Sequence, residues 1–125
     1  MEQNTKLRKL LIDSLKTEYK YLPDGYADLV VELIELTNLK NKGYNGEGRR
    51  DGSFRECERM GLLAWEGLMV RMGDKISRMY NLARNHKDSS YDDARQLESL
   101  KDTLMDLANY ALFCVTFLEE GKLSE

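Results

Sequence analysis

Glu98, Asp102 and Asp106 follow one another at intervals of four residues near the end of the chain. In a helix, side chains at this spacing lie on one stripe, about 5–6 Å apart, and like charges there repel each other. Asn109 and Phe113 continue the same stripe. Such a helix loses stability unless a cation neutralises the carboxylates, and either a divalent metal ion or a basic neighbouring helix would do so. The acidic stripe is therefore the first candidate for a functional site.

A second segment, residues 71–78, carries basic side chains that fall within one arc of a helix at about 100° per residue. Carboxylates can hold Mg²⁺, which binds phosphate oxygens and activates water, while Lys and Arg neutralise the charge that develops. Aromatic and amide side chains nearby suit a nucleobase. The two segments together predict phosphate chemistry on a nucleotide. The candidate residues are Asp74, Glu98, Asp102 and Asp106 for catalysis and metal binding, Arg71, Lys75 and Arg78 for phosphate binding, and Asn109, Tyr110 and Phe113 for base binding.

Simpler explanations compete with this site. Residues 71–78 alone are typical of a solvated face, and salt bridges to a neighbouring helix would also account for the acidic stripe. Paired carboxylates also serve glycosidases, but a small helical bundle offers no long groove for sugars. Glu32 and Glu35 lie one helical turn apart; solvent exposure explains them more simply, although they would complete a metal site if they faced the acidic stripe. A purely structural interaction module is the weakest alternative.

Composition and charge narrow the class of protein. The chain has 125 residues and 14.5 kDa, which is enough for one domain with its own core. Its net charge of −3 and pI near 5.3 argue against binding to polymeric nucleic acid. No apolar stretch approaches the roughly 20 residues that span a bilayer, and the polar N-terminus has no signal-peptide core. We therefore expect a cytoplasmic protein without a membrane partner.

Cysteine and histidine are too few for a zinc site. The sequence has Cys57, Cys114 and His86 and no C-x-x-C motif, so neither a zinc site nor a His-based catalytic site can be assembled. Cys114 lies on an apolar helix face and is expected to be a buried thiol. Any metal ion must be held by oxygen ligands, which favours Mg²⁺ or Mn²⁺.

Hydrophobic residues recur at helical spacing along most of the chain, and no segment shows the period of two that strands require. The pattern predicts an all-α, four-helix-type bundle with a Gly-rich central loop. The S-x-x-E spacing at Ser53 is expected to begin a further short helix, and Gly121 to end the last one. The expected main helices are residues 2–22, 26–40, 67–85 and 96–120, and the expected loops are residues 41–51 and 85–93.

The apolar residues of each helix mark the face expected to pack into the core. Phe113 and Phe117 instead continue the acidic stripe, which predicts a pocket with a charged mouth and an apolar floor. The predicted core residues are Leu7, Leu10, Leu11, Leu15 and Tyr19 in the first helix, Leu29, Val30, Leu33, Ile34, Leu36 and Leu39 in the second, Met69, Met72, Ile76, Met79 and Tyr80 in the third, and Leu100, Leu104, Leu107, Ala111, Cys114 and Leu118 in the last.

Residues 67–82 (GLMVRMGDKISRMYNL) and 98–111 (ESLKDTLMDLANYA) resemble the phage- and bacteria-borne nucleotide modification associated domain family. That family is similar to the all-α nucleoside triphosphate pyrophosphohydrolases, the MazG-like and dimeric dUTPase class. Residues 40–44 (KNKGY) and 53–54 (SF) resemble the family's Lys-Asn-x-Asp-Tyr and Pro-Phe elements. The likeness covers roughly residues 36–118.

The resemblance implies a Mg²⁺-dependent enzyme that cleaves an NTP or dNTP to the monophosphate and pyrophosphate. It also implies a homodimer or homotetramer and, for a phage-encoded protein, the host cytoplasm. The wider class has E-x-x-E on the first site helix and E-x-x-D on the second, whereas this chain has Arg71-x-x-Asp74 and Glu98-x-x-x-Asp102. Arg71 in place of a metal ligand favours the rival hypothesis, a non-catalytic protein on the same fold that binds a nucleotide or sequesters a nucleotide signal.

Overall fold

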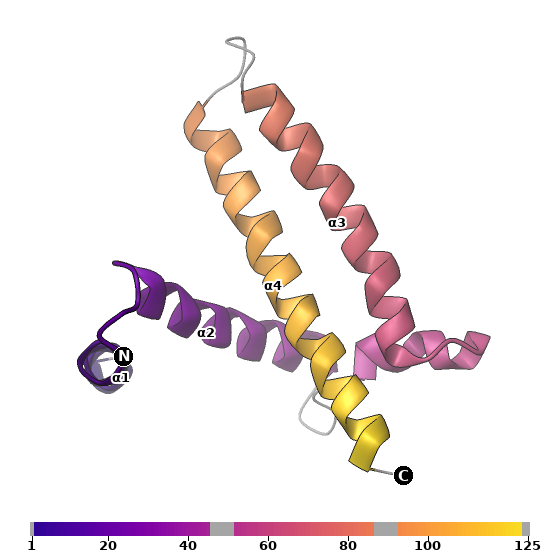
Figure 1. Cartoon of the computed structure of the whole chain (residues 1–125), viewed down its shortest axis with the longest axis horizontal. Helices are drawn as coiled ribbons and strands as arrows, with labels where there is room; N and C mark the ends of the chain where they lie inside the picture. Colours follow the sequence, from indigo (N-terminus) through magenta and orange to yellow (C-terminus); the bar gives the residue numbers. More distant parts are fainter. Residues whose placement is uncertain (1, 46–51, 87–92, 124–125) are drawn as a thin grey trace. The chain divides into compact units, whose positions relative to one another are not determined.

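The computed structural model describes residues 2–45, 52–86 and 93–123, and every regular element in these residues is helical. The expected all-α fold class and the short helix after the central segment are confirmed. Among the described residues, no helix combines the length and the hydropathy that a membrane span requires. The elements are α1 (Glu2–Glu18), α2 (Tyr26–Asn45), the 3₁₀ helix η1 (Gly52–Met60), α3 (Ala64–His86) and α4 (Asp93–Leu123), as shown in Figure 1.

The chain divides into two compact units, residues 1–46 and residues 47–125. The first unit contains α1 and α2, and the second contains η1, α3 and α4. The single domain expected from the chain length stays a prediction, as does the packing of four helices into one bundle.

In the first unit, α1 and α2 pack through a small apolar core. Residues 19–25 connect the two helices, and Pro23 within them cannot continue a helix. Gly25 follows with a φ of 83°, a left-handed conformation that glycine adopts without strain. The buried residues of this core are Ile12, Ala27 and Val31, with Leu15 packed against them.

Two ion pairs also join α1 to α2. Nε of Arg8 donates a hydrogen bond of 2.8 Å to Oε1 of Glu35, and Nζ of Lys16 lies 3.3 Å from Oδ2 of Asp28. The hydrogen bond to Glu35 and its negative charge raise the pKa of Arg8 above its ordinary value. Because all four side chains are exposed, these pairs align the helices more than they stabilise them.

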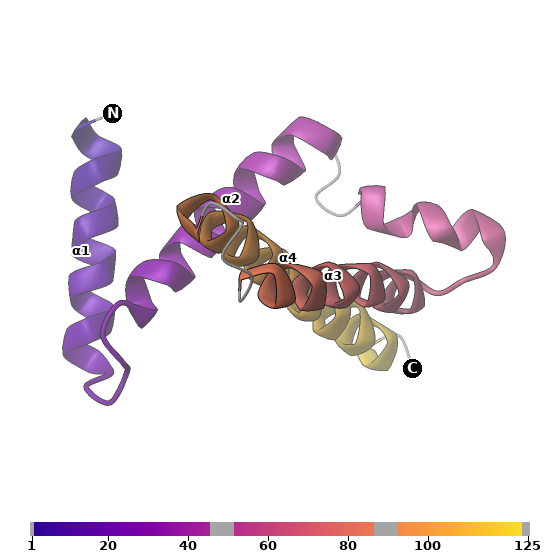
Figure 2. The ribbon, with the colours of Figure 1, turned by 90° about the horizontal axis from the view of Figure 1, so that it is seen from above.

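In the second unit, α3 and α4 form an antiparallel hairpin, and both views show them side by side (Figures 1 and 2). η1 packs against α3 and contributes an aromatic ring to the core. The buried residues of this core are Phe54, Ala64, Leu68 and Phe117, with Trp65, Tyr110, Phe113 and Cys114 packed against them.

Several helix ends differ from the prediction. α1 ends at Glu18 and not at residue 22. A turn follows it, in which the N–H of Leu22 donates a hydrogen bond to the carbonyl oxygen of Tyr19, and Pro23 keeps Leu22 out of the helical conformation. Residues 41–45 belong to α2 and not to a loop, while residues 46–51 and 87–92 of the two expected loops lie outside the described residues. α4 begins at Asp93 and passes through Gly121, since one glycine costs a helix only about 1 kcal/mol.

α3 begins at Ala64, three residues before the predicted start, and the side chain of Glu66 explains this. The backbone N–H of Leu63 donates a hydrogen bond of 2.9 Å to Oε1 of Glu66. An acidic residue at the third helical position that reaches back to the residue before the helix is one half of a capping box. The helix start is therefore set by a polar contact that the hydrophobic pattern does not reveal.

The faces through which the helices pack differ from the prediction more than the helix ends do. On α4, the face toward α3 carries Thr103, Tyr110 and Phe117 and not the predicted leucine stripe. Aromatic rings explain this choice, because each buries more apolar area than a leucine and prefers contact with another ring. The predicted core residues that are exposed are Leu7, Leu10, Leu11, Tyr19, Leu29, Val30, Ile34, Leu36, Leu39, Met69, Ile76, Tyr80, Leu104, Ala111 and Leu118.

Candidate functional site

Lys75 and Asp106 fix the register of the α3–α4 hairpin. Nζ of Lys75 donates a hydrogen bond of 2.8 Å to Oδ2 of Asp106, and the two side chains are 25% and 22% exposed. Because the helices are antiparallel, Arg78 lies at the level of Asp102. The basic segment therefore supplies a counter-charge to the acidic stripe, which is one of the two solutions that the charge pattern predicts.

The other candidate residues of α3 lie on one flank of this contact. With Lys75 facing α4, Arg71, Asp74 and Arg78 lie about 40–100° around the helix axis from it, all in the same rotational direction. All three are exposed. This flank of α3 is accessible to a charged ligand.

The acidic helix presents a matching flank. With Asp106 facing α3, Glu98, Asp102 and Asn109 lie about 40–80° around the axis of α4, in the same rotational direction as on α3. Equal rotations on two antiparallel helices lead to the same side of a hairpin. Glu98 and Asp102 are exposed, and Asn109 is half-buried. We call this surface the charged side, and its members are Arg71, Asp74, Arg78, Glu98, Asp102 and Asn109.

The carboxylates of the charged side do not converge. Within residues 2–45, 52–86 and 93–123, no three His, Cys, Asp or Glu side chains are arranged to hold a metal ion. Carboxylates spaced along one helix stripe point in parallel, and Asp106 is paired with Lys75. Carboxylate oxygens are the type of ligand that Mg²⁺ prefers, and Mg²⁺ is commonly bound by only one or two carboxylates together with substrate phosphates. The metal role of these residues therefore stays a prediction.

Glu35, which was considered as a further metal ligand, is paired with Arg8. Glu32 lies one turn earlier on α2 and is half-buried. Their part in a metal site also stays a prediction.

Two of the three predicted base-binding residues, Tyr110 and Phe113, pack in the aromatic core of the second unit. The ring of Phe54 meets Tyr110 edge-on at 5.8 Å and Phe113 at 4.5 Å between centroids, and Phe113 lies 6.3 Å from Phe117. The guanidinium carbon of Arg71 lies 5.4 Å from the centroid of Phe54, within the range of cation–π attraction. The aromatic cluster and the charged side therefore meet at Arg71.

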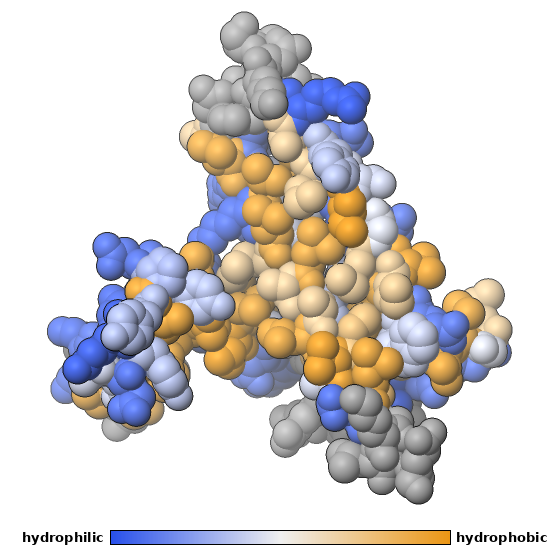
Figure 3. Space-filling model, in the orientation of Figure 1, coloured by the Kyte–Doolittle hydropathy of each residue, from blue (hydrophilic) through white to orange (hydrophobic). Residues whose placement is uncertain are grey.

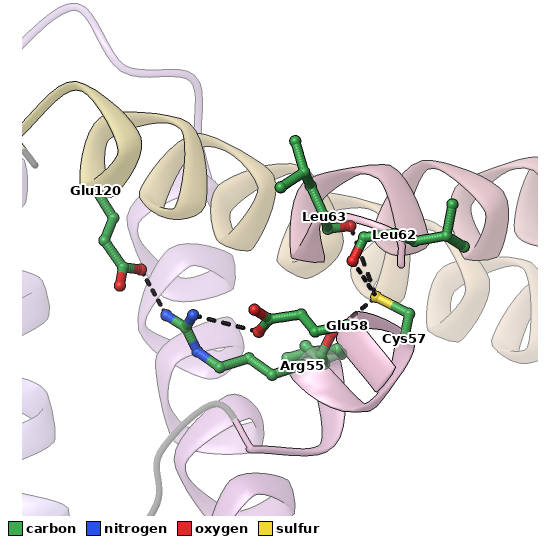
Figure 4. Close-up of polar contacts among 7 residues, drawn as sticks. Arg55, Cys57, Glu58, Leu62, Leu63 and Glu120 are labelled. Carbon is green, nitrogen blue, oxygen red and sulfur yellow. Dashed lines mark hydrogen bonds and ion pairs between the residues drawn. The ribbon is translucent and has the colours of Figure 1, made fainter. Parts of the chain in front are cut away.

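Arg55 ties η1 to the end of α4. Its guanidinium group hydrogen-bonds to Glu120 and lies 3.5 Å from Glu58, as Figure 4 shows. The same group stacks over Phe117, with 4.7 Å between Cζ and the ring centroid. Because η1 carries Phe54, these contacts position the ring on which Arg71 lies.

Cys57 ties η1 to the start of α3. Its Sγ lies 3.6 Å from the carbonyl oxygens of Phe54 and Leu63 and 3.9 Å from that of Leu62 (Figure 4). It also packs against Gly67, where a Cβ atom would lie only 2.5 Å from Sγ. The glycine therefore allows the close approach of η1 to α3.

Sequence reasoning missed Phe54 and Arg55 as supports of this region. The sequence did contain an indication for Phe54, because residues 53–54 resemble the Pro-Phe element named above. Its ring partners are distant in the sequence, so no local pattern reveals them. Nothing in the sequence around Arg55 indicates that it reaches Glu120.

This chain matches no protein-family model, no curated protein and no solved structure. The resemblance drawn from residues 67–82 and 98–111 therefore stays a hypothesis.

Proposed function

We propose that this protein is a Mg²⁺- or Mn²⁺-dependent nucleotide pyrophosphohydrolase, which converts an NTP or dNTP to the monophosphate and pyrophosphate. The observation that carries the proposal is the charged side of the α3–α4 hairpin, where basic and acidic residues meet beside an aromatic cluster. The proposed roles are catalysis and metal binding for Asp74, Glu98, Asp102 and Asp106, phosphate binding for Arg71, Lys75 and Arg78, and base binding for Asn109, Tyr110 and Phe113.

Phosphate binding has the most direct support. Arg71 and Arg78 are exposed on the charged side, about two turns apart along α3. Lys75 lies between them, with Asp106 as its counter-charge. Phosphate oxygens bound by Lys75 would replace Asp106 as its counter-charge, and the carboxylate of Asp106 would then be available to other ligands. A triphosphate therefore changes the electrostatics of the acidic stripe when it binds.

The metal ion would be held by the carboxylates of α4 and by Asp74. When bound, it polarises the phosphoryl oxygens and activates a water molecule. Asn109, half-buried on α4, offers an amide for a base edge, and the rings of Tyr110 and Phe113 offer stacking surfaces. We also propose that the protein works in the cytoplasm as a homo-oligomer, which the resemblance implies.

The rival function is a non-catalytic protein that binds a nucleotide or sequesters a nucleotide signal. Two observations favour it. Asp106 is paired with Lys75, and the described carboxylates form no group of three that would hold a metal ion. Phosphate binding and base binding need no group of three carboxylates. In this rival function the basic residues still bind phosphate and the aromatic residues still bind the base, and only hydrolysis is lost.

One experiment separates the two functions. The protein is incubated with a panel of NTPs and dNTPs with Mg²⁺ or Mn²⁺, and pyrophosphate release and nucleotide binding are measured together. The test variant is Asp102→Asn, which removes one exposed carboxylate of the charged side. The matched control is Glu18→Gln, which removes an exposed carboxylate at the end of α1.

Turnover that disappears in Asp102→Asn and persists in Glu18→Gln supports the enzyme. Nucleotide binding without turnover in the wild type supports the sequestering protein. Absence of both overturns the two proposals and leaves the structural interaction module.

A further inference from the structure

Two arginines of the second unit lie over aromatic rings, and their surroundings differ. The guanidinium group of Arg55 lies over the ring of Phe117. It also contacts two carboxylates, those of Glu58 and Glu120 (Figure 4). The protein itself therefore neutralises the charge of Arg55.

Arg71 has a ring beneath it but no carboxylate beside it. Its Cζ lies 5.4 Å from the ring centroid of Phe54. Among the residues that the structure describes, no hydrogen bond or ion pair involves its guanidinium group. A cation–π contact uses the charge of the guanidinium group and not its N–H donors. Those donors are therefore available to an anion.

The ring of Phe54 is held in place on several sides. It is 9% exposed and contacts the rings of Tyr110 and Phe113 of α4. The next residue, Arg55, is hydrogen-bonded to Glu120 near the other end of the same helix. A ring fixed in this way offers Arg71 a surface at a defined position.

The end of η1 is also fixed, directly before the helix that carries Arg71. The N–H of Leu62 donates a hydrogen bond to the carbonyl oxygen of Cys57, and the N–H of Gly61 donates one to that of Glu58. These are the two bonds of a Schellman motif, with Gly61 in the left-handed conformation at a φ of 85°. The motif joins η1 to α3 without a long connection, so the ring and the arginine belong to one short segment.

The hairpin separates its apolar surface from Arg71. Figure 3 shows one side of the α3–α4 hairpin covered mainly by apolar residues. Arg71 lies on the charged side, about 40° around the axis of α3 from Lys75. Lys75 is already bonded to Asp106, whereas Arg71 can bind an anion without the loss of an ion pair.

We infer that Phe54 is a positioning residue for phosphate binding, because its ring holds the guanidinium group of Arg71 in place before a ligand binds. Two parallel N–H donors of a guanidinium group match two oxygens of a phosphate. A long side chain that is already ordered loses less freedom when it forms these bonds. The inference rests on the phosphate-binding part of the proposed function and not on hydrolysis or base binding.

The test uses inorganic tripolyphosphate without a metal ion, so that only phosphate contacts are measured. Binding is followed by isothermal titration calorimetry, and helical content by circular dichroism. The test variant is Phe54→Leu. The matched control is Phe117→Leu, since the two rings are 9% and 7% exposed and each lies under a guanidinium group.

Phe54→Leu should bind tripolyphosphate about two- to tenfold more weakly, because Arg71 must then be ordered on binding. Phe117→Leu should bind it like the wild type, since Arg55 keeps its carboxylate partners. In the background of Arg71→Gln, Phe54→Leu should have no further effect, because the residue through which it acts is absent. Equal losses in the two leucine variants, or the same loss with and without Arg71, would overturn the inference.

A measurement on the wild type needs no folded variant. The mobility of the Nε–Hε group of Arg71 is compared by nuclear magnetic resonance with that of Arg78, which has no ring contact or ion pair within the described residues. In the ligand-free protein the group of Arg71 should be the more ordered of the two, and its resonance should shift when tripolyphosphate is added. Equal mobility, or no shift, would contradict the role of Phe54.

Failure of the inference and failure of the proposed enzyme give different results. Nucleotide turnover is measured separately on the wild type. Tripolyphosphate binding that depends on Phe54 through Arg71 supports the inference even where no nucleotide is hydrolysed. A wild type that does not bind tripolyphosphate overturns the inference, and the turnover measurement alone decides whether the protein is an enzyme.

Discussion

Lys75 of α3 and Asp106 of α4 are joined by a hydrogen-bonded ion pair of 2.8 Å, with each side chain about one-quarter exposed. Asp106 is the last of three carboxylates on one stripe, and Lys75 is the middle cation of the basic segment. The pair therefore links the two segments that the charge pattern singles out. It also fixes which residues of α3 and α4 lie opposite each other.

We predict a measurable coupling between these two residues. In a double-mutant cycle with Lys75→Met and Asp106→Asn, the coupling free energy should be about 0.5–1 kcal/mol, since partial exposure screens the charges. Urea unfolding of the four proteins measures it. The cycle is needed because Asp106 makes a further interaction, which a single substitution would also disturb. A coupling indistinguishable from zero would show that the pair aligns the hairpin without stabilising it.

The pairing of the two segments shows how far the sequence could predict the site. Charge spacing was sufficient to predict that either a metal ion or a basic helix would meet the acidic stripe, because like charges on one helix require a counter-charge nearby. Lys75 is that counter-charge for Asp106. The role of Arg71 against Phe54 could not be predicted. A ring contact between η1 and α3 depends on how two separate elements pack, and no local pattern carries that information.

The core shows a similar limit. Helical spacing was sufficient to predict the all-α class and all four main helices, because propensity and periodicity are local properties. It was insufficient to choose the packed face of α4, which has apolar side chains on two opposite faces. Leu104 and Leu118 appear equivalent to core residues in the sequence, but the rings of Tyr110 and Phe117 occupy the contact with the rest of the unit.

Gly67 and Gly73 should respond in opposite ways to alanine. At Gly67, the new Cβ would lie 2.5 Å from Sγ of Cys57, so Gly67→Ala should lower the free energy of unfolding by about 1–3 kcal/mol. At Gly73 no atom lies within 4 Å, so Gly73→Ala should raise it by up to about 1 kcal/mol through helix propensity. Chemical unfolding measures both. Adding Cys57→Ala to Gly67→Ala should restore part of the loss, and no recovery would contradict the proposed clash.

The hydrogen bond that caps the start of α3 can be tested with two substitutions of Glu66, one that removes the acceptor and one that keeps it. Glu66→Ala removes the acceptor for the N–H of Leu63 and should cost about 0.5–2 kcal/mol. Glu66→Gln keeps an acceptor oxygen at the same place and should retain most of the stability. Thermal unfolding followed by circular dichroism compares the two. Equal losses would mean that the carboxylate charge, and not the hydrogen bond, stabilises this helix start.

Cys114 should make stability fall at alkaline pH. Burial raises the pKa of its thiol above the value of 9.0 expected for an unperturbed cysteine, and the thiol donates a hydrogen bond to the carbonyl oxygen of Trp65 at 3.5 Å. Because the folded protein holds this proton more tightly than the unfolded chain, the group has no effect well below pH 9. As the pH rises past the unfolded pKa, the unfolded chain loses its proton first, and stability falls until the pH reaches the folded pKa.

Other groups also titrate in this range, so the measurement is a difference between two proteins. The free energy of unfolding of the wild type and of Cys114→Ala is measured from about pH 7 to about pH 10. The difference in this free energy between the two proteins should become smaller above about pH 9. Alkylation followed by peptide mass spectrometry gives an independent readout, because only the thiolate reacts. Cys114 should be modified more slowly in the folded protein than in urea at the same pH. Equal rates in the two states would show that its thiol is not held in the protonated form by the contact between α3 and α4.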